Sequence, residues 1–447
     1  MIGSISDDTF MLCKTIYISL GIFILILVWN SFRKNKKLNM FDFFSLYFFI
    51  SHCLTSSLVL DEVNRGVYFR YLMTSQDRYH LWSALATVFV YLVILLSFKL
   101  FRRGKRTYTI KRVVDIYSKK FWLFCAFYLG FLFLCLFLWT LQYGSIFGMF
   151  QYASAIRDGA EMNNPLAIFS RFCTAFPLVF FAFLKISIRD FKNRSKRFIP
   201  SLLLCIASLF GTIVNLINLD GRGLVIIFIL MFVFILFDKR IRRISSPLAT
   251  FVILIVVLFC TSIGVISSSN NELDDSGVDS EFSGFMVKEF SYVYTNMVNT
   301  FYMYDNGIID GFRIKDNLIS IPFSWLPISV KPKDLQNMNQ FNTSLYKSTT
   351  GQLPVDLVSG SIMTLGWVGL ALVPMFYGWL IALTEKLLAG YRDIAFYTII
   401  YYYFGIHRMQ SFATFIDLSP ILLSMFGSVV YIISAQFICG ERKELNE

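Results

Sequence analysis

Runs of about 20 apolar residues recur along most of this chain, and no other feature limits its fold as strongly. A helix needs about 20 apolar residues to cross a bilayer, because each residue adds about 1.5 Å of length. Charged residues make up 16% of the 447 positions and hydrophobic residues 56%, whereas a soluble chain carries about 25% charged residues. The sequence therefore predicts an all-α, polytopic integral membrane helix bundle.

Eleven segments have the composition of membrane helices, namely 11–32, 41–60, 81–100, 121–141, 166–188, 198–219, 223–237, 248–267, 362–384, 393–406 and 419–438. Their spacing divides the chain into 1–267 with eight helices, a large loop at 268–361, and 362–447 with three helices and a tail. The loop is about 90 residues long. We expect it to be partly helical, since Val287–Asn306 has the pattern of an amphipathic helix. The three parts are expected to act as one functional unit.

The distribution of basic residues predicts the orientation. Asp7 and Asp8 precede the first apolar run and a basic cluster follows it, which is typical of an anchor helix with its N-terminus outside. With that start, the loops that fall inside carry nearly twice as many Lys and Arg residues as the outside. The net charge of +12 is then a topology signal. We expect the lipid bilayer as a partner and no nucleic acid.

The sequence lacks the motifs that several kinds of chemistry require. The eight cysteines and three histidines are scattered, without a CxxC pair, so we expect neither a disulfide framework nor a zinc site. No GxxxxGK[ST] phosphate loop, GxSxG nucleophile elbow or HExxH motif occurs. No metal and no cofactor are expected.

The turn at Asn215–Gly223 is the first candidate site. Asp-Gly is a tight-turn signal, and the apolar run after it, Leu224–Phe237, is too short to span a bilayer comfortably. Asp220 and Arg222 should therefore lie at or just inside the outer membrane surface. An ionisable pair at that depth indicates a functional site. The alternative is a short turn whose Arg222 extends to lipid phosphates.

Apart from Lys14 at the start of the first helix, the basic residues of the short outer loops and outer helix ends are all arginines. They are Arg65, Arg70, Arg78, Arg157, Arg171, Arg222 and Arg408. Arginine is preferred where a planar fork must bind phosphate in a bidentate manner. Arg65, Arg70 and Arg78 lie among tyrosines, which favours an interfacial belt for these three. Arg171 lies inside the fifth helix and should face the bundle interior, either in a structural ion pair or on substrate.

Other polar groups lie near these arginines in the sequence. Glu161 shares an outer loop with Arg157, and His407-Arg408 ends a second short helix. Two short helices that end in Arg222 and Arg408 predict a polar recess in the outer leaflet. A lipid-linked phosphate would find its anion receptors there.

The chain carries Arg157 in the earlier outer loop, Asp220-Gly221-Arg222-Gly223 after the sixth helix, Thr350-Gly351-Gln352-Leu353-Pro354, and the glycines from Gly360 to Gly369. In these features, and over most of its length, it resembles the bacterial O-antigen and oligosaccharide repeat-unit polymerases of the Wzy type. The long loop departs from the family pattern in carrying a single arginine, Arg313, where such loops often carry several.

The resemblance implies a glycosyltransferase of the bacterial inner membrane, with a periplasmic N-terminus, a cytoplasmic C-terminus and an active site facing the periplasm. Its substrates would be undecaprenyl-pyrophosphate-linked oligosaccharides, joined into O-antigen or capsular polysaccharide with release of undecaprenyl pyrophosphate. A chain-length regulator and a flippase are the implied protein partners.

Within that mechanism the residues take expected roles. Arg222 and Arg171, and next Arg157 and Arg408, are expected on the pyrophosphate. The acceptor hydroxyl needs a base, for which Asp220, Glu161 and His407 remain alternatives. Arg313 and Gly351 are expected to bind substrate from the long loop, whose Tyr- and Asn-rich part would hold sugars. Alternative functions are an O-antigen ligase and a lipid-linked oligosaccharide flippase or transporter.

Overall fold

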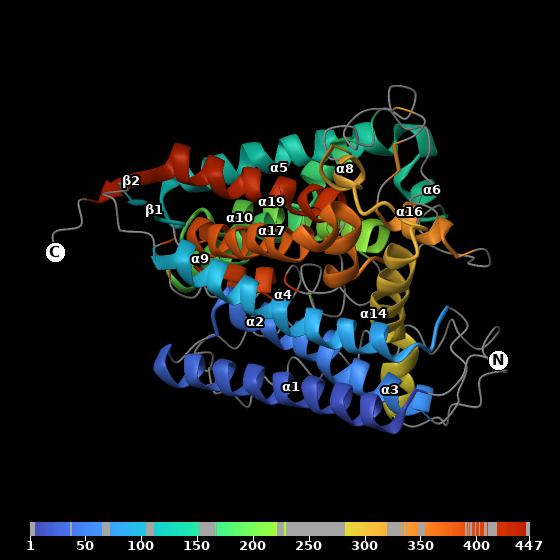
Figure 1. The fold of residues 1–447 in the computed structure, drawn as a ribbon. Helices are drawn as coiled ribbons and strands as arrows, with labels where there is room; N and C mark the ends of the chain where they lie inside the picture. The colour runs from blue at the N-terminus through green and yellow to red at the C-terminus, as the bar shows by residue number, and fades with distance from the viewer. Residues whose placement is uncertain are drawn as a thin grey trace.

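The structure is a computed structural model of the whole chain. It describes residues 5–35, 38–64, 72–103, 111–151, 166, 168–220, 228, 282–319, 332, 335–336, 338–346, 354–388, 391, 393, 396–397, 399–401, 403–405, 409 and 418–443. The described residues are mostly helical (Figure 1).

Seven described helical segments are long and apolar enough to cross a membrane. They are α1 (Asp7–Asn35), α2 with α3 (Met40–Asn64), α4 (Asp77–Arg103), α5 with η2 (Lys119–Tyr143), α8 with α9 (Ile168–Lys192), α10 with η3 (Phe198–Asp220) and α17 (Leu357–Leu388). A shorter apolar stretch, Met425–Cys439, belongs to α19 (Leu418–Cys439). The prediction of a multi-pass helical membrane protein is confirmed. The expected helices at 223–237 and 248–267 lie outside the described residues.

The large loop contributes described helices of its own. They are α14 (Phe282–Asp305), η5 (Lys315–Ile319) and α16 (Met338–Ser344). The predicted helix at Val287–Asn306 is confirmed as α14, which runs across the direction of α1 and α4 (Figure 1). Residues Val293–Phe301 of α14 are buried, so this helix is a packed part of the bundle.

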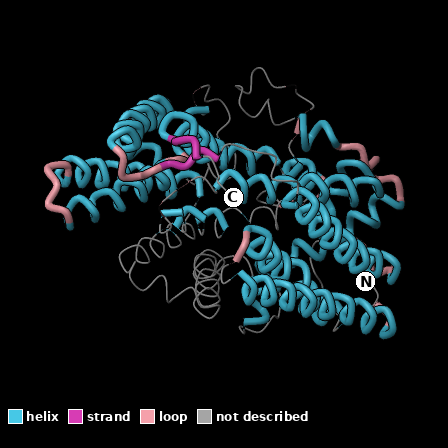
Figure 2. Tube along the Cα trace, turned by 90° about the vertical axis from the view of Figure 1, so that its left-hand side faces the viewer, coloured by secondary structure: helices cyan, strands magenta, loops and turns pink. Residues whose placement is uncertain are grey.

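A two-stranded antiparallel ribbon is a feature that the sequence did not predict. Strand β1 (Lys111–Val114) pairs with β2 (Gly440–Lys443), with Val113 opposite Glu441. Figure 2 looks onto this side of the molecule and shows both strands among the helices. We call this side the ribbon end.

Several basic loops that the sequence places inside meet at the ribbon end. The guanidinium of Arg189, at the end of α9, lies 4.1 Å from the centre of the Tyr117 ring. Lys386 Nζ, at the end of α17, donates to the Phe101 carbonyl at 2.8 Å. These contacts join the 101–120, 189–197 and 385–392 loops. The predicted topology places all three loops on the same side of the membrane.

The opposite end holds the starts of α1 and α4 together with α6 (Ile146–Gln151) and α16 (Figure 1). The backbone amide of Ser6 donates to Asp77 Oδ1 at 3.0 Å, which joins the starts of α1 and α4. We call this side the α6 end, and every described candidate site residue belongs to elements that reach it.

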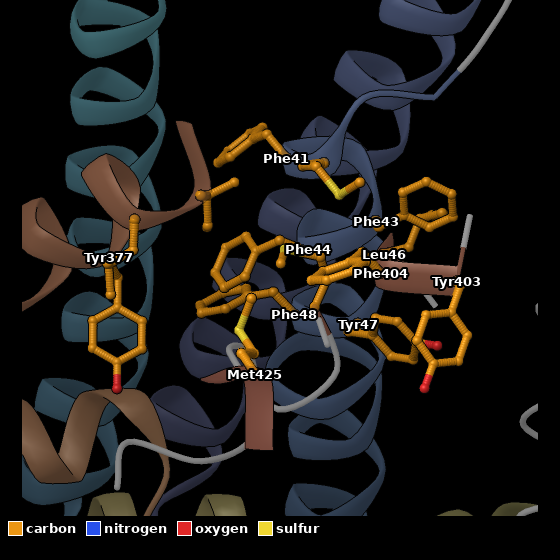
Figure 3. Close-up of a cluster of buried hydrophobic side chains, with 14 of the residues drawn as sticks. Phe41, Phe43, Phe44, Leu46, Tyr47, Phe48, Tyr377, Tyr403, Phe404 and Met425 are labelled. Atoms are coloured by element: carbon orange, nitrogen blue, oxygen red, sulfur yellow. The ribbon is translucent and has the colours of Figure 1, made fainter. Parts of the chain in front are cut away.

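The core beside α2 is aromatic. All nine residues of α2 (Met40–Phe48) are buried, and Figure 3 shows its phenylalanines beside Tyr403 and Phe404. A Cβ on Gly405 would lie 2.5 Å from the Phe43 ring, so glycine allows this close approach. Dispersion and burial of such large rings stabilise the bundle interior.

Candidate functional site

The structure describes three of the predicted site residues. Arg171 and Arg313 are described with their side chains, and Asp220 by its backbone alone. The others lie outside the described residues, namely Arg157, Glu161, Arg222, Gly351, His407 and Arg408. The candidate site is therefore built from the elements that carry Arg171, Asp220 and Arg313.

Arg313 is held on three sides. Its Nη1 donates to Asp316 Oδ2 at 3.1 Å, and Nε lies 3.8 Å from Asp310 Oδ1. Its guanidinium carbon lies 3.9 Å from the centre of the Phe341 ring, which is a cation–π distance. The side chain stays 29% exposed, whereas that of Asp316 is fully buried. This is an oriented guanidinium with an accessible side.

A break in α17 fixes the backbone beneath Arg313. Leu365 (φ −145°, ψ 25°) and Gly366 (φ 58°, ψ −146°) leave the helical conformation. A Cβ on Gly369 would lie 1.9 Å from the Ser361 carbonyl oxygen, so the two halves of α17 bend sharply together. The Arg313 amide donates to the Met363 carbonyl at 2.8 Å. In a continuous helix this carbonyl would accept a hydrogen bond from an amide of the same helix.

This break corrects the expected ninth helix. The sequence predicted this helix at 362–384. The helix begins at Leu357, and Gly366 and Gly369 lie inside it at the break. Positive φ at Gly366 explains the choice of glycine there, because other residues are strained in that region.

Arg171 also lies at a break. It occupies the last turn of α8 (Ile168–Cys173), and α9 starts at Phe176 with Pro177 in its first turn. The expected helix at 166–188 corresponds to one apolar span, Ile168–Lys192, that is interrupted before Phe176, because proline is favoured in the first turn of a new helix. Arg171 is partly buried on this short helix.

Helix α19 packs directly on the Arg171 segment. Ser428 Oγ donates to the Thr174 carbonyl at 2.8 Å, an acceptor released by the break. A Cβ on Gly427 would lie 2.5 Å from the Arg171 carbonyl oxygen, so only glycine fits this crossing. The same helix also contacts η5, the turn that follows Arg313. One helix thus touches α8, which bears Arg171, and the turn that follows Arg313.

Asp220 ends the π-helical turn η3 (Leu216–Asp220). This turn contacts α6, whose last residue, Gln151, precedes the loop that contains Arg157. Single π turns inside α-helices are frequent at functional sites. Asp220, Arg171 and Arg313 thus each lie in or beside an interrupted helix.

The asparagines of α14 do not form an open surface. Asn296 Nδ2 donates to the Pro354 carbonyl at 2.7 Å, and Asn299 Nδ2 donates to the Tyr346 hydroxyl at 3.0 Å. Both asparagines are buried. Because buried amides are costly to leave unbonded, we infer that they fix the backbone before α17 instead of holding sugars.

His52 and Asp356 form a buried pair that the sequence analysis missed. His52 Nε2 lies 4.0 Å from Asp356 Oδ1, and both side chains are fully buried. Asp356 precedes α17 and accepts the amides of Val358 and Ser359 at 2.9 and 3.0 Å. An Asp before an apolar run is a helix N-cap signal, which could have indicated Asp356 but not its distant partner.

Burial raises the pKa of the Asp356 carboxyl to about 6, although the hydrogen bonds from Ser359 and Val358 favour its charged form. It follows Gly351 by five positions in the sequence and comes immediately before the apolar span. Asp356 is therefore a titratable group at the entry to the broken helix.

In chemical terms, the described arrangement offers the N–H donors on the exposed side of a guanidinium that already pairs with Asp316. Arg313 presents a guanidinium at the α6 end, and Arg171 lies on another element against the same helix α19. A comparison with protein-family models, curated proteins and solved structures found no match for this chain.

Proposed function

We propose that the protein is a membrane glycosyltransferase that polymerises undecaprenyl-pyrophosphate-linked oligosaccharide repeat units into O-antigen or capsular polysaccharide. The reaction joins the anomeric carbon of the growing glycan to a hydroxyl of a new repeat unit. The bond between that carbon and the pyrophosphate oxygen breaks, and the hydroxyl proton passes to a base. The leaving group is undecaprenyl pyrophosphate.

The observation that carries this proposal is the position of α19. This helix contacts α8, which bears Arg171, and η5, which follows Arg313. A pyrophosphate leaving group develops negative charge, and preorganised guanidinium groups stabilise that charge. Arg313 is preorganised because Asp316 and Phe341 fix its side chain.

Sequence features complete the proposal. Arg222, Arg157 and Arg408 would add further cations from neighbouring outer loops, and Asp220, Glu161 or His407 would accept the proton. The bundle of apolar helices suits a substrate whose polyprenyl tail remains in the bilayer. The active site would face the periplasm.

The glycan ladder of a strain lacking the gene tests the proposal. Loss of a polymerase leaves single repeat units on the acceptor lipid, loss of a ligase leaves polymer on its carrier lipid, and loss of a flippase leaves no surface glycan. Complementation with Arg313→Ala or Arg313→Lys is expected not to restore long chains, because Lys lacks the planar fork. Arg194→Ala, at an exposed position after α9, is the matched control and should restore them. Long chains in the deletion strain would refute the proposal.

A further inference from the structure

An ion pair and three aromatic rings meet where the start of α4, the end of α14 and the break in α17 adjoin. We call Arg78, Trp82, Tyr304, Asp305 and Trp367 the aromatic patch. The ring centres of Trp82 and Trp367 are 5.4 Å apart, with an interplanar angle of 82°. Those of Tyr304 and Trp367 are 6.1 Å apart at 76°. Edge-to-face contacts of this kind fix ring orientation.

Polar groups border these rings. Arg78 Nη2 lies 2.9 Å from Asp305 Oδ2, and the Arg78 guanidinium carbon lies 5.9 Å from the centre of the Trp82 ring. The Tyr79 hydroxyl also donates to Asp305 Oδ2, at 2.8 Å. The patch therefore combines aromatic surface, a guanidinium donor and a carboxylate acceptor, all in fixed positions.

The patch remains accessible. Trp367 is 49% exposed, and the side chains of Arg78 and Asp305 are 52% and 33% exposed. Trp367 directly follows Gly366, so the break in α17 determines where its ring lies. A half-exposed tryptophan held by three other rings, those of Trp82, Tyr304 and Phe301, is a preformed contact surface.

We propose that the aromatic patch binds a pyranose sugar of the substrate oligosaccharide. One face of a pyranose ring carries C–H groups, which match the negative face of an aromatic ring. Its hydroxyl groups both donate and accept hydrogen bonds, so they need an acceptor such as Asp305 and a donor such as Arg78. This assignment rests on the proposed function.

A lipid headgroup fits the patch less well. Tryptophan and arginine also occur at membrane interfaces, but the patch places the Asp305 carboxylate beside Arg78. The carboxylate repels a lipid phosphate and already pairs with the arginine. A sugar hydroxyl can donate to that carboxylate without a charge conflict, so a neutral, hydroxyl-rich ligand is favoured.

The patch adjoins the Arg313 segment through Tyr304. A Cβ on Gly311 would lie 2.3 Å from Tyr304 Cε2, and a Cβ on Gly366 would lie 2.6 Å from the Tyr304 hydroxyl. Arg313 follows Gly311 by two positions. A sugar in the patch would thus lie near a phosphate on Arg313, which matches a substrate whose glycan is attached to pyrophosphate.

Calorimetric titration of the full-length protein in detergent tests the assignment. The probe is the oligosaccharide repeat unit released by mild acid from the carrier lipid of the strain that carries the gene. Wild-type protein should bind it, and Trp367→Ala and Asp305→Asn should each weaken binding by about tenfold, since one aromatic or charged contact accounts for roughly that factor. Trp29→Ala is the matched control, because Trp29 is a 56% exposed tryptophan on the apolar helix α1.

Equal binding by Trp367→Ala and wild type, or no binding by wild type, would overturn the sugar site. If the same substitutions weakened binding to glycan-free phosphatidylglycerol vesicles as much as binding to the oligosaccharide, the patch would be an interfacial anchor. That result would also overturn the sugar site. Trp367→Phe keeps an aromatic ring and should retain most binding, which separates lost contact from misfolding. A normal glycan ladder in the deletion strain, together with patch-dependent binding, would refute the polymerase and leave the sugar site standing.

Discussion

The backbone amide of Arg313 donates to the carbonyl oxygen of Met363 at 2.8 Å, so the break in α17 holds the arginine segment in place. A Cβ on Gly311 would lie 3.2 Å from Gly366 Cα, which brings the two backbones into close contact. The geometry of Arg313 is therefore coupled to the glycines of a distant helix.

The glycine at the break should be hard to replace. Gly366→Ala adds a Cβ at a φ of +58°, 2.6 Å from the Tyr304 hydroxyl, and such strain costs about 1–3 kcal/mol. We expect a lower midpoint of thermal unfolding in detergent and shorter glycans in cells. Gly130→Ala in α5 is the control, since its Cβ meets nothing within 4 Å, and it should leave both unchanged or raise the midpoint. Equal effects of the two substitutions would contradict the role of the break.

The carboxylate of Asp316 should orient Arg313. Asp316→Ala removes a buried partner of the guanidinium, and we expect chain extension to fall at least tenfold, as after loss of about 1.4 kcal/mol. Asp310→Ala should have little effect, because Asp310 is 68% exposed and exposed ion pairs contribute about 0–1 kcal/mol. The polymer yields of the two single variants and of the double variant, Asp316→Ala with Arg313→Ala, measure the coupling free energy between Asp316 and Arg313. Additive losses would show that the two residues act separately.

The pKa of Asp356 predicts a pH dependence of stability. Burial raises the pKa of its carboxyl to about 6, above the ordinary value, so the folded state binds the proton more tightly than the unfolded state. The stabilising contribution is fully present below about pH 4 and is lost as the pH rises through about 6, amounting to at most about 3 kcal/mol. Asp356→Asn keeps an oxygen acceptor for the α17 amides and should flatten this part of the profile. Unfolding midpoints between pH 4 and 7 provide the measurement, and parallel profiles for the two proteins would exclude Asp356 as the source.

The orientation in the membrane is testable at two exposed positions at opposite ends of the bundle. Asn306 follows α14, and Arg194 follows α9. A periplasmic phosphatase fused after Asn306 should be active, whereas one fused after Arg194 should be inactive. The reverse pattern would invert the predicted topology.

The lengths of the apolar runs in the sequence predicted most of the fold. Helices α1, α4 and α5 coincide with the expected segments 11–32, 81–100 and 121–141, because the hydrophobic run alone determines a membrane helix. The interruption between α8 and α9 had a sequence signal in Pro177, and that in α17 had one in Gly366. Neither signal specifies where the chain goes after the break, which depends on tertiary contacts.

Contacts between distant segments were not predictable. The ribbon pairs Val113 with Glu441 near the end of the chain, and neither strand has an apolar alternation of its own. His52 with Asp356, and Arg78 with Asp305, are likewise pairs that only the packing of helices brings together. The sequence singled out Arg171 and Arg313 by residue type, and the structure adds that α19 contacts both α8, which bears Arg171, and η5, which follows Arg313.

Polymerisation by the purified protein tests the central claim most directly. The protein in detergent or proteoliposomes would be given undecaprenyl-pyrophosphate-linked repeat units as the sole sugar source, without nucleotide sugar or added metal. The account predicts a ladder of glycans that lengthen by whole repeat units, with one undecaprenyl pyrophosphate released for each bond formed. Unextended repeat units with wild-type protein, or extension that requires a nucleotide sugar, would contradict it.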